Sequence, residues 1–141
     1  YLKTQGQDRI VNFNEWTVPL GRRFRALKLW FVLRAYGLEG LRERIRNHVH
    51  WADEARLALA EIPGIEITTP ASLSLFSFAL AAGDTATERL LALFNDDGRT
   101  YLTQTRHAGR FVIRVQVGQF DCTREDVMMI PNVVHELMER L

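Results

Sequence analysis

The sequence is poor in cysteine, in net charge and in long apolar runs, and each shortage excludes a class of protein. Its single cysteine, Cys122, excludes an internal disulfide framework and is typical of a reducing compartment such as the cytoplasm. Eighteen basic and seventeen acidic residues leave a net charge of +1, so no overall field draws the chain to nucleic acid or to an anionic membrane. The run SLFSFALAAG is far shorter than the roughly 20 apolar residues that span a bilayer.

Common motifs of catalysis and metal binding are missing as well. The chain has no glycine-rich phosphate loop, no nucleophile elbow and no cluster of cysteine and histidine. His50 and Glu54 have the helical spacing of metal ligands, but no third ligand converges on them, so we predict a surface histidine and no metal site. The start YLKTQGQDR lacks both an initial methionine and a signal-peptide layout, which indicates a piece of a longer polypeptide.

What is present predicts one α+β domain with helices at its beginning. The chain is 47% hydrophobic, which is enough for a core. Residues 1–21 are polar and irregular, and residues 22–36 predict a helix that is apolar around most of its circumference. Gly37 and Gly40 interrupt this pattern. A second helix follows and ends at Pro63–Gly64, with an expected core stripe of Leu41, Ile45, Val49, Ala52, Arg56 and Leu59.

The second half of the chain predicts a small antiparallel sheet. Thr85 and Glu88 have the spacing of a capping box at the start of a helix, and Thr123 with Asp126 caps the last helix. The residues HAG, at 107–109, separate two alternating segments and predict a hairpin. The expected elements are strands at 65–68, 73–80, 101–106 and 110–117, and helices at 86–94 and 123–141. We therefore expect three or four strands covered on one face by helices.

Several of these segments resemble one enzyme family. The run WTVPLGRRFRALKLWFVLRAYGLEGL, at 16–41, resembles the opening of the C-terminal part of the pyridoxal-phosphate-dependent decarboxylases of the aromatic-L-amino-acid decarboxylase family. IRNHV, RFVIR and TREDV, at 45–49, 110–114 and 123–127, resemble the same family in the same order. The resemblance implies the C-terminal small domain of a fold-type-I enzyme. Its expected parts are a lid end and interdomain loop at 1–21, connecting helices at 22–62 and a small α+β domain at 63–141.

The resemblance also implies an activity, a cofactor and partners. Members convert an aromatic L-amino acid to its amine and carbon dioxide, as homodimers in the cytoplasm. Their pyridoxal phosphate is carried as a Schiff base by a lysine of a large domain that precedes the point where this sequence starts. The chain has only Lys3 and Lys28, and neither matches that lysine. We therefore expect the chain alone to be inactive and to need the large domain, and we expect no nucleic-acid or membrane partner.

Two residues match functional positions of the family. Tyr1, in YLK, resembles the lid tyrosine that protonates the carbanion left when carbon dioxide departs, and a surface tyrosine is the alternative. Gly21 matches a position that lines the pocket around the substrate side chain, where the similar histidine decarboxylases tend to carry serine; a turn glycine is the alternative. Arg22, Arg23 and Arg25 are expected to contact carboxylates and carbonyls of the large domain, or else to form a solvated first turn.

Two other functions stay open from the sequence. The same scaffold becomes an aromatic aldehyde synthase when the lid residue is not tyrosine, and Tyr1 argues against that outcome. A non-catalytic α+β module that binds RNA or a protein is the second alternative. Such a module wants exposed aromatic side chains on adjacent strands; Tyr101 and Phe111 are candidates, although we expect Phe111 to be buried.

Overall fold

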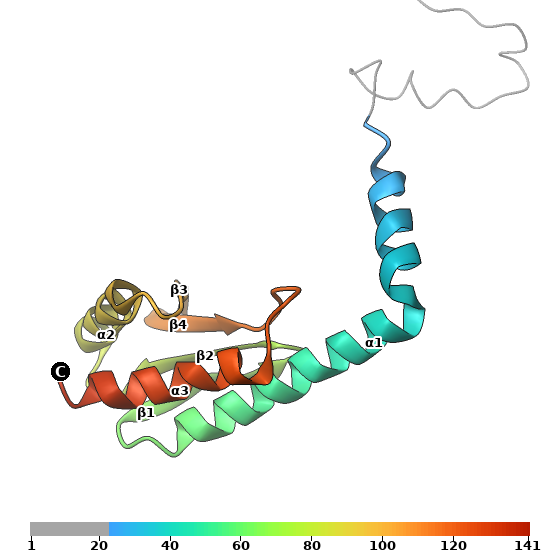
Figure 1. The fold of residues 1–141 in the computed structure, drawn as a ribbon. Helices are drawn as coiled ribbons and strands as arrows, with labels where there is room; N and C mark the ends of the chain where they lie inside the picture. The colour runs from blue at the N-terminus through green and yellow to red at the C-terminus, as the bar shows by residue number, and fades with distance from the viewer. Residues whose placement is uncertain (1–22) are drawn as a thin grey trace, which may run out of the picture. The chain divides into compact units, whose positions relative to one another are not determined.

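The computed structural model describes residues 23–141 and shows an α+β fold, as predicted (Figure 1). Its elements in order are α1 (Arg25–Ala60), β1 (Ile65–Ser72), β2 (Leu75–Leu80), α2 (Asp84–Asp97), β3 (Thr103–His107), β4 (Arg110–Gln116) and α3 (Arg124–Met138). The chain divides into two units, residues 1–38 and residues 39–141. No helix of the described part is long and apolar enough to cross a membrane.

The boundary between the two units lies directly after a break in the helical backbone of α1, at Gly37. Gly37 has φ 66° and ψ 167°, which is far from helical geometry and is open to glycine because it has no Cβ. The interruption predicted at Gly37 is therefore confirmed. Gly40 lies in regular helix beyond the break, so the second predicted interruption is wrong.

The four strands form one antiparallel sheet in the order β1-β2-β4-β3. The predicted hairpin is confirmed, with His107 opposite Arg110 across a turn made of Ala108 and Gly109. Phe76 lies opposite Val115 and Phe78 opposite Ile113, which puts four fully buried side chains on one face. That face packs against the helices of residues 39–141, as expected. The helical core residues are Ala52, Ala55, Leu59, Leu90, Leu91, Phe94, Val127, Ile130, Val133, Val134 and Leu137.

One detail of helix packing differs from the prediction. Ala52 and Leu59 of the expected core stripe are fully buried, but Ile45 is 59% exposed, and His48 and Ala55 complete the buried stripe. The stripe still follows the i, i+3, i+4 spacing of a helix that packs against a core.

The two predicted capping boxes have opposite outcomes. Thr123 and Asp126 form the full box at the start of α3. The box at Thr85 is wrong, because α2 begins at Asp84, two residues before the predicted start of the helix, and its N-cap residue Gly83 has no side-chain cap. The buried side chain of Thr87 makes the bonds at this end of α2. Its hydroxyl donates to the Gly83 carbonyl at 2.9 Å and accepts from the Leu80 amide at 3.0 Å. These two bonds fix the start of α2 and connect it to the end of β2, although no side chain caps the helix.

Candidate functional site

The two residues predicted for catalysis and substrate binding, Tyr1 and Gly21, lie outside the described residues, and so does Arg22. The structure therefore leaves their roles as predictions. The described residues that follow them directly in the sequence are those at the start of α1.

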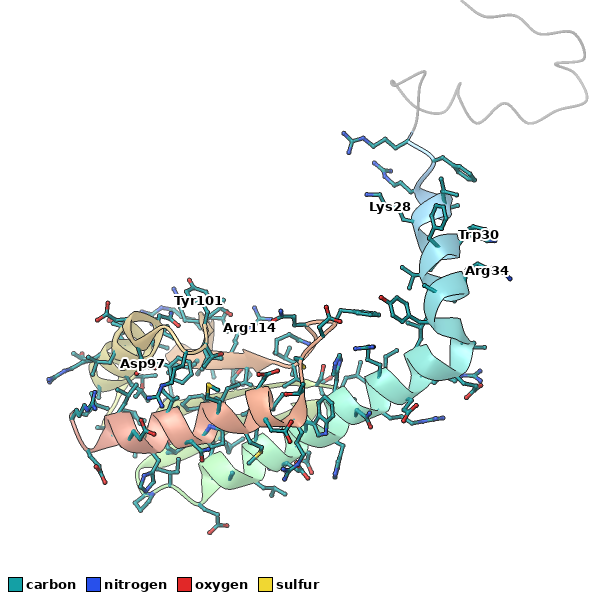
Figure 2. All side chains as sticks on the ribbon, in the orientation of Figure 1. Lys28, Trp30, Arg34, Asp97, Tyr101 and Arg114 are labelled. Atoms are coloured by element: carbon teal, nitrogen blue, oxygen red, sulfur yellow. The ribbon has the colours of Figure 1, made fainter. Side chains whose placement is uncertain are left out.

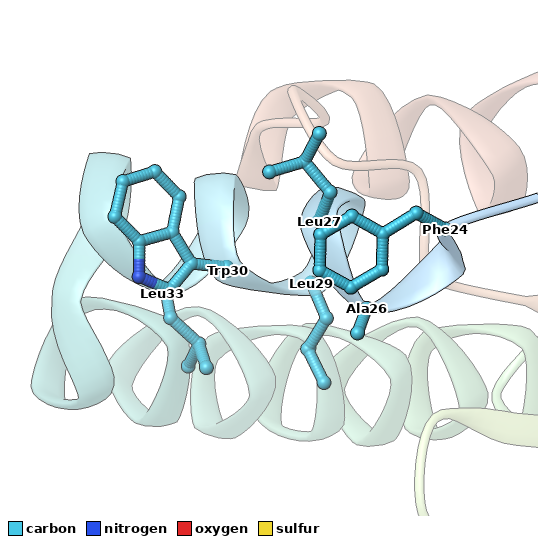
Figure 3. Close-up of a pocket in the computed structure, with 6 residues that line it drawn as sticks. All are labelled: Phe24, Ala26, Leu27, Leu29, Trp30 and Leu33. Carbon is cyan, nitrogen blue, oxygen red and sulfur yellow. The ribbon is translucent and has the colours of Figure 1, made fainter. Parts of the chain in front are cut away.

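The first turns of α1 form an exposed apolar surface. Phe24 is 72% exposed, and Trp30 and Phe31 are each more than half exposed. Figure 3 shows the open hollow of about 520 Å³ on this helix, which is lined by Phe24, Ala26, Leu27, Leu29, Trp30 and Leu33. The Trp30 ring stands edge-on to Phe31 with centroids 5.2 Å apart, so the aromatic side chains partly cover one another. Contiguous exposed apolar surface of this kind is typical of interaction sites and ligand grooves.

Cations accompany the apolar surface. Arg23, Arg25 and Lys28 are exposed, and the Arg34 guanidinium carbon lies 5.8 Å from the centroid of the Trp30 ring. Residues 23–38 contain no aspartate or glutamate, and the first turn of α1 has no acidic residue. Cations at a helix N-terminus oppose the helix dipole. This segment is therefore suited to contact carboxylates from outside residues 23–38.

The described residues do not fit pyridoxal phosphate. The cofactor needs a lysine for the imine, an acidic partner for its ring nitrogen and donors for its phosphate. Lys28, the one lysine in residues 23–141, is exposed among apolar side chains, and the segment 23–38 around it supplies no carboxylate (Figure 2). We therefore derive no chemical step from the cofactor within this part of the chain.

The two histidines of α1 have different surroundings. His50 is exposed and its Nε2 lies 3.2 Å from Glu54 Oε1, so the prediction of a surface histidine is confirmed. His48 is only 8% exposed and its Nε2 has no hydrogen-bond partner among residues 23–141. Burial, and then the charge of Arg44, hold the pKa of His48 below its ordinary value. No group of three potential ligands that could hold a metal ion occurs in the described part of the chain.

The remaining candidates carry no reactive site. The Cys122 thiol is partly buried, and burial, followed by the charge of Asp126, raises its pKa, which keeps it protonated and unreactive. Tyr101 is 73% exposed, whereas Phe111 packs against the core. The pair of exposed aromatics that an RNA-binding sheet would use is therefore not formed by these two residues.

Comparisons with known proteins identify the family. Residues 1–81 match the pyridoxal-dependent decarboxylase conserved domain. Tyrosine decarboxylase 2 of Arabidopsis thaliana is 42% identical over 124 residues, which are 83% of this chain and 23% of that protein. Aromatic-L-amino-acid decarboxylase of Sus scrofa is 38% identical over 127 residues, or 89% of this chain and 25% of that protein. Phenylacetaldehyde synthase of Arabidopsis thaliana is 36% identical over 123 residues, which are 82% of this chain and 25% of that protein.

A solved structure agrees with the sequence relatives. The crystal structure of Catharanthus roseus tryptophan decarboxylase in complex with L-tryptophan superimposes with a TM-score of 0.86 and 30% identity, covering 96% of this chain and 30% of that one. The chain thus spans about a quarter of the length of the relatives it matches. The family depends on pyridoxal phosphate. The chain belongs to the pyridoxal-dependent decarboxylase family, in the branch that contains the aromatic amino-acid decarboxylases and the related aldehyde synthases.

Proposed function

We propose that the chain is the C-terminal part of an enzyme that converts an aromatic L-amino acid to its amine and carbon dioxide. The observation that carries this proposal is the similarity of nearly the whole chain to tryptophan decarboxylase, at a TM-score of 0.86. Tyrosine decarboxylase and aromatic-L-amino-acid decarboxylase as relatives add support.

The proposal includes an organisation and partners. Residues 1–21 form the lid end and an interdomain loop, residues 22–62 the connecting helices and residues 63–141 the small domain. A large domain of the same enzyme holds the cofactor and its lysine, and the enzyme works as a cytoplasmic homodimer. The exposed apolar and cationic start of α1 supports this arrangement, because it suits a surface that a second domain covers. The chain without that domain has no decarboxylase activity.

In this proposal Tyr1 is the catalytic acid. Its phenol donates a proton to the substrate carbon that has lost carbon dioxide, while the closed lid keeps water away. The match of YLK to the end of the family's lid loop supports the assignment. Protonation at this carbon is what directs the reaction to the amine.

Tyr1→Phe in the full-length enzyme tests this role. We expect cofactor absorbance and substrate binding to persist while amine production falls by 100-fold or more, within the range of about 10²–10⁴ typical of general acid catalysis. Oxygen then reacts at the unprotonated carbon, so aldehyde and ammonia appear while oxygen is consumed and hydrogen peroxide forms. Tyr101→Phe is the matched control, since Tyr101 is an exposed tyrosine far along the chain. Unchanged amine turnover in Tyr1→Phe would contradict the assignment.

An aldehyde synthase on the same scaffold is the second candidate. Phenylacetaldehyde synthase of Arabidopsis thaliana, which is 36% identical to this chain, favours it. Product analysis of the unmodified enzyme separates the two: a decarboxylase gives the amine without oxygen uptake, whereas a synthase gives the aldehyde with it. Tyr1 favours the amine.

Gly21 is proposed to line the pocket for the substrate side chain, where the missing Cβ leaves room for an aromatic ring. Gly21→Ser adds a hydroxymethyl group to the pocket. It is expected to lower kcat/KM for bulky aromatic substrates by about 10- to 200-fold, the range typical of a methylene-sized change in a substrate pocket. A smaller substrate such as histidine should lose little. Kinetics with both substrates, together with Tm, check this. Equal losses that follow a lowered Tm would make Gly21 a turn residue only.

A further inference from the structure

The sheet has a second face, which we call the outer face and which lies entirely within residues 39–141. Successive side chains of a strand point to opposite faces, so the sequence neighbours of the core residues Phe76 and Ile113 point away from the core. Ala79 and Val112 belong to the outer face. Both are buried, yet neither is part of the core cluster that contains the apolar side chains of the helices. The core side chains of these helices therefore pack against the other face of the sheet.

One row of the outer face crosses all four strands and carries a single charge. Ser77 of β2 lies directly opposite Arg114 of β4. The row continues to Thr69 of β1 on one side and to Thr103 of β3 on the other. The other three residues of the row have short hydroxyl side chains, so its one cation is Arg114 (Figure 2). Because β4 is an inner strand of the sheet, this arginine lies away from the two edges of the outer face.

The two arginines that β4 places on the outer face differ in their partners. Arg110 Nη1 donates to Glu66 Oε2 at 2.8 Å, and Arg110 Nη2 donates to the Leu80 carbonyl at 3.4 Å. Arg114 is half-buried, and its side chain has no ion pair or hydrogen bond with any residue of the described part of the chain. A guanidinium keeps its charge at every physiological pH and offers five N–H donors. Arg114 therefore suits an anionic partner from outside residues 23–141.

We propose that Arg114 pairs with a carboxylate side chain of the large domain, so that the outer face of the sheet is a second surface on which that domain docks. The inference rests on the part of the proposed function that gives the enzyme a large domain. The relatives are about four times as long as this chain, so most of the protein surface that could cover the outer face belongs to the rest of the enzyme. Guanidinium and carboxylate match in shape and in charge. The short side chains of Ser77 and Thr103 let another protein surface approach the guanidinium closely.

Cross-linking of the full-length enzyme with a water-soluble carbodiimide tests this pairing. The reagent joins a lysine amine to a carboxylate that contacts it, forming an amide with the loss of one water, and it does not join arginine. Arg114→Lys keeps the positive charge and supplies the amine. In this variant we expect a cross-linked peptide that joins the segment around position 114 to a segment of the large domain. Mass spectrometry of the digested protein detects this peptide, which the unmodified enzyme should lack.

Arg110→Lys is the matched control, because its carboxylate partner lies on the same face, and it should form a link to Glu66 within the chain. Two results for Arg114→Lys would overturn the proposal. One is a link only to carboxylates of residues 1–141. The other is no link under conditions in which the control forms its own, as expected if a small free anion occupies the site. The cross-link does not depend on turnover, so an enzyme that makes aldehyde still forms it, and its loss leaves the result of Tyr1→Phe unchanged.

Discussion

At the scale of single residues, the start of α3 is held by a reciprocal capping box between Thr123 and Asp126. The Thr123 hydroxyl accepts from the Asp126 amide at 3.3 Å, and the Asp126 carboxylate accepts from the Thr123 amide at 2.8 Å and from its hydroxyl at 2.9 Å. These bonds hold the pKa of Asp126 below its ordinary value, the backbone bond from Thr123 being the largest cause. The charge state of one carboxyl group is therefore linked to the stability of the helix start.

Thr123→Ala is expected to lower the free energy of unfolding by about 1 kcal/mol at neutral pH, the usual cost of losing a cap. Thr85→Ala is the matched control, because Thr85 precedes a similar acidic pattern but caps nothing in the structure. We expect its effect to stay within about 0.5 kcal/mol. Urea unfolding followed by circular dichroism measures both. Equal losses in the two variants would contradict the assignment of the cap.

The same box predicts a pH dependence. Because the pKa of Asp126 is lowered in the folded protein, its contribution is fully present above the ordinary aspartate pKa, about 4, and is lost as pH falls through the lower folded value. Asp126→Asn should therefore lose stability relative to the unmodified protein at pH 7, and the difference should shrink at pH 3. A difference that stays constant with pH would show that the charge of Asp126 does not contribute.

At the scale of elements, the sequence predicted correctly those helices and strands whose position depends on hydrogen bonds between residues close in the chain. The β3–β4 hairpin followed from alternation and a turn, and α3 followed from a cap. The start of α2 and part of the buried stripe of α1 were missed, because tertiary contacts decide them. Thr87 bonds to the end of β2, and packing buries His48 and Ala55 of α1 while it leaves Ile45 exposed. The hydrogen bond from Arg44 to the Phe120 carbonyl was missed for the same reason, since the two residues are 76 positions apart in the sequence.

The turn of the β3–β4 hairpin offers a test at this scale. Ala108 and Gly109 have φ of 49° and 81°, both in the left-handed region, and a Cβ on Gly109 would have no neighbour within 4 Å. Gly109→Ala should therefore lower stability by roughly 1–2 kcal/mol through backbone strain alone. Ala108→Asn should raise it by a few tenths of a kcal/mol, because asparagine followed by glycine favours this turn. Urea unfolding measures both. Opposite signs are expected, and a loss of stability in both variants would contradict this account of the turn.

At the scale of the whole molecule, the two units differ in how they bury apolar surface. Residues 39–141 have a core of fully buried side chains from the sheet and three helices. Residues 23–38 expose most of their large apolar side chains and carry four cations without one acidic residue. The relatives are about four times as long as this chain. A surface that is both apolar and cationic is what the proposed junction with a large domain requires, since it can combine burial with contacts to carboxylates.

This difference predicts how the 141-residue chain behaves without the proposed large domain. Exposed apolar surface at the start of α1 should bind a hydrophobic dye and drive self-association, because association removes that surface from water. The double variant Trp30→Ser, Phe31→Ser should reduce both effects, as these rings are more than half exposed. Leu73→Ser is the control, because Leu73 is 77% exposed in the other unit. Dye fluorescence and sedimentation velocity measure the two effects. A monomer that binds no dye would contradict the prediction, and so would an equal reduction by Leu73→Ser, since the apolar surface responsible would then not be confined to α1.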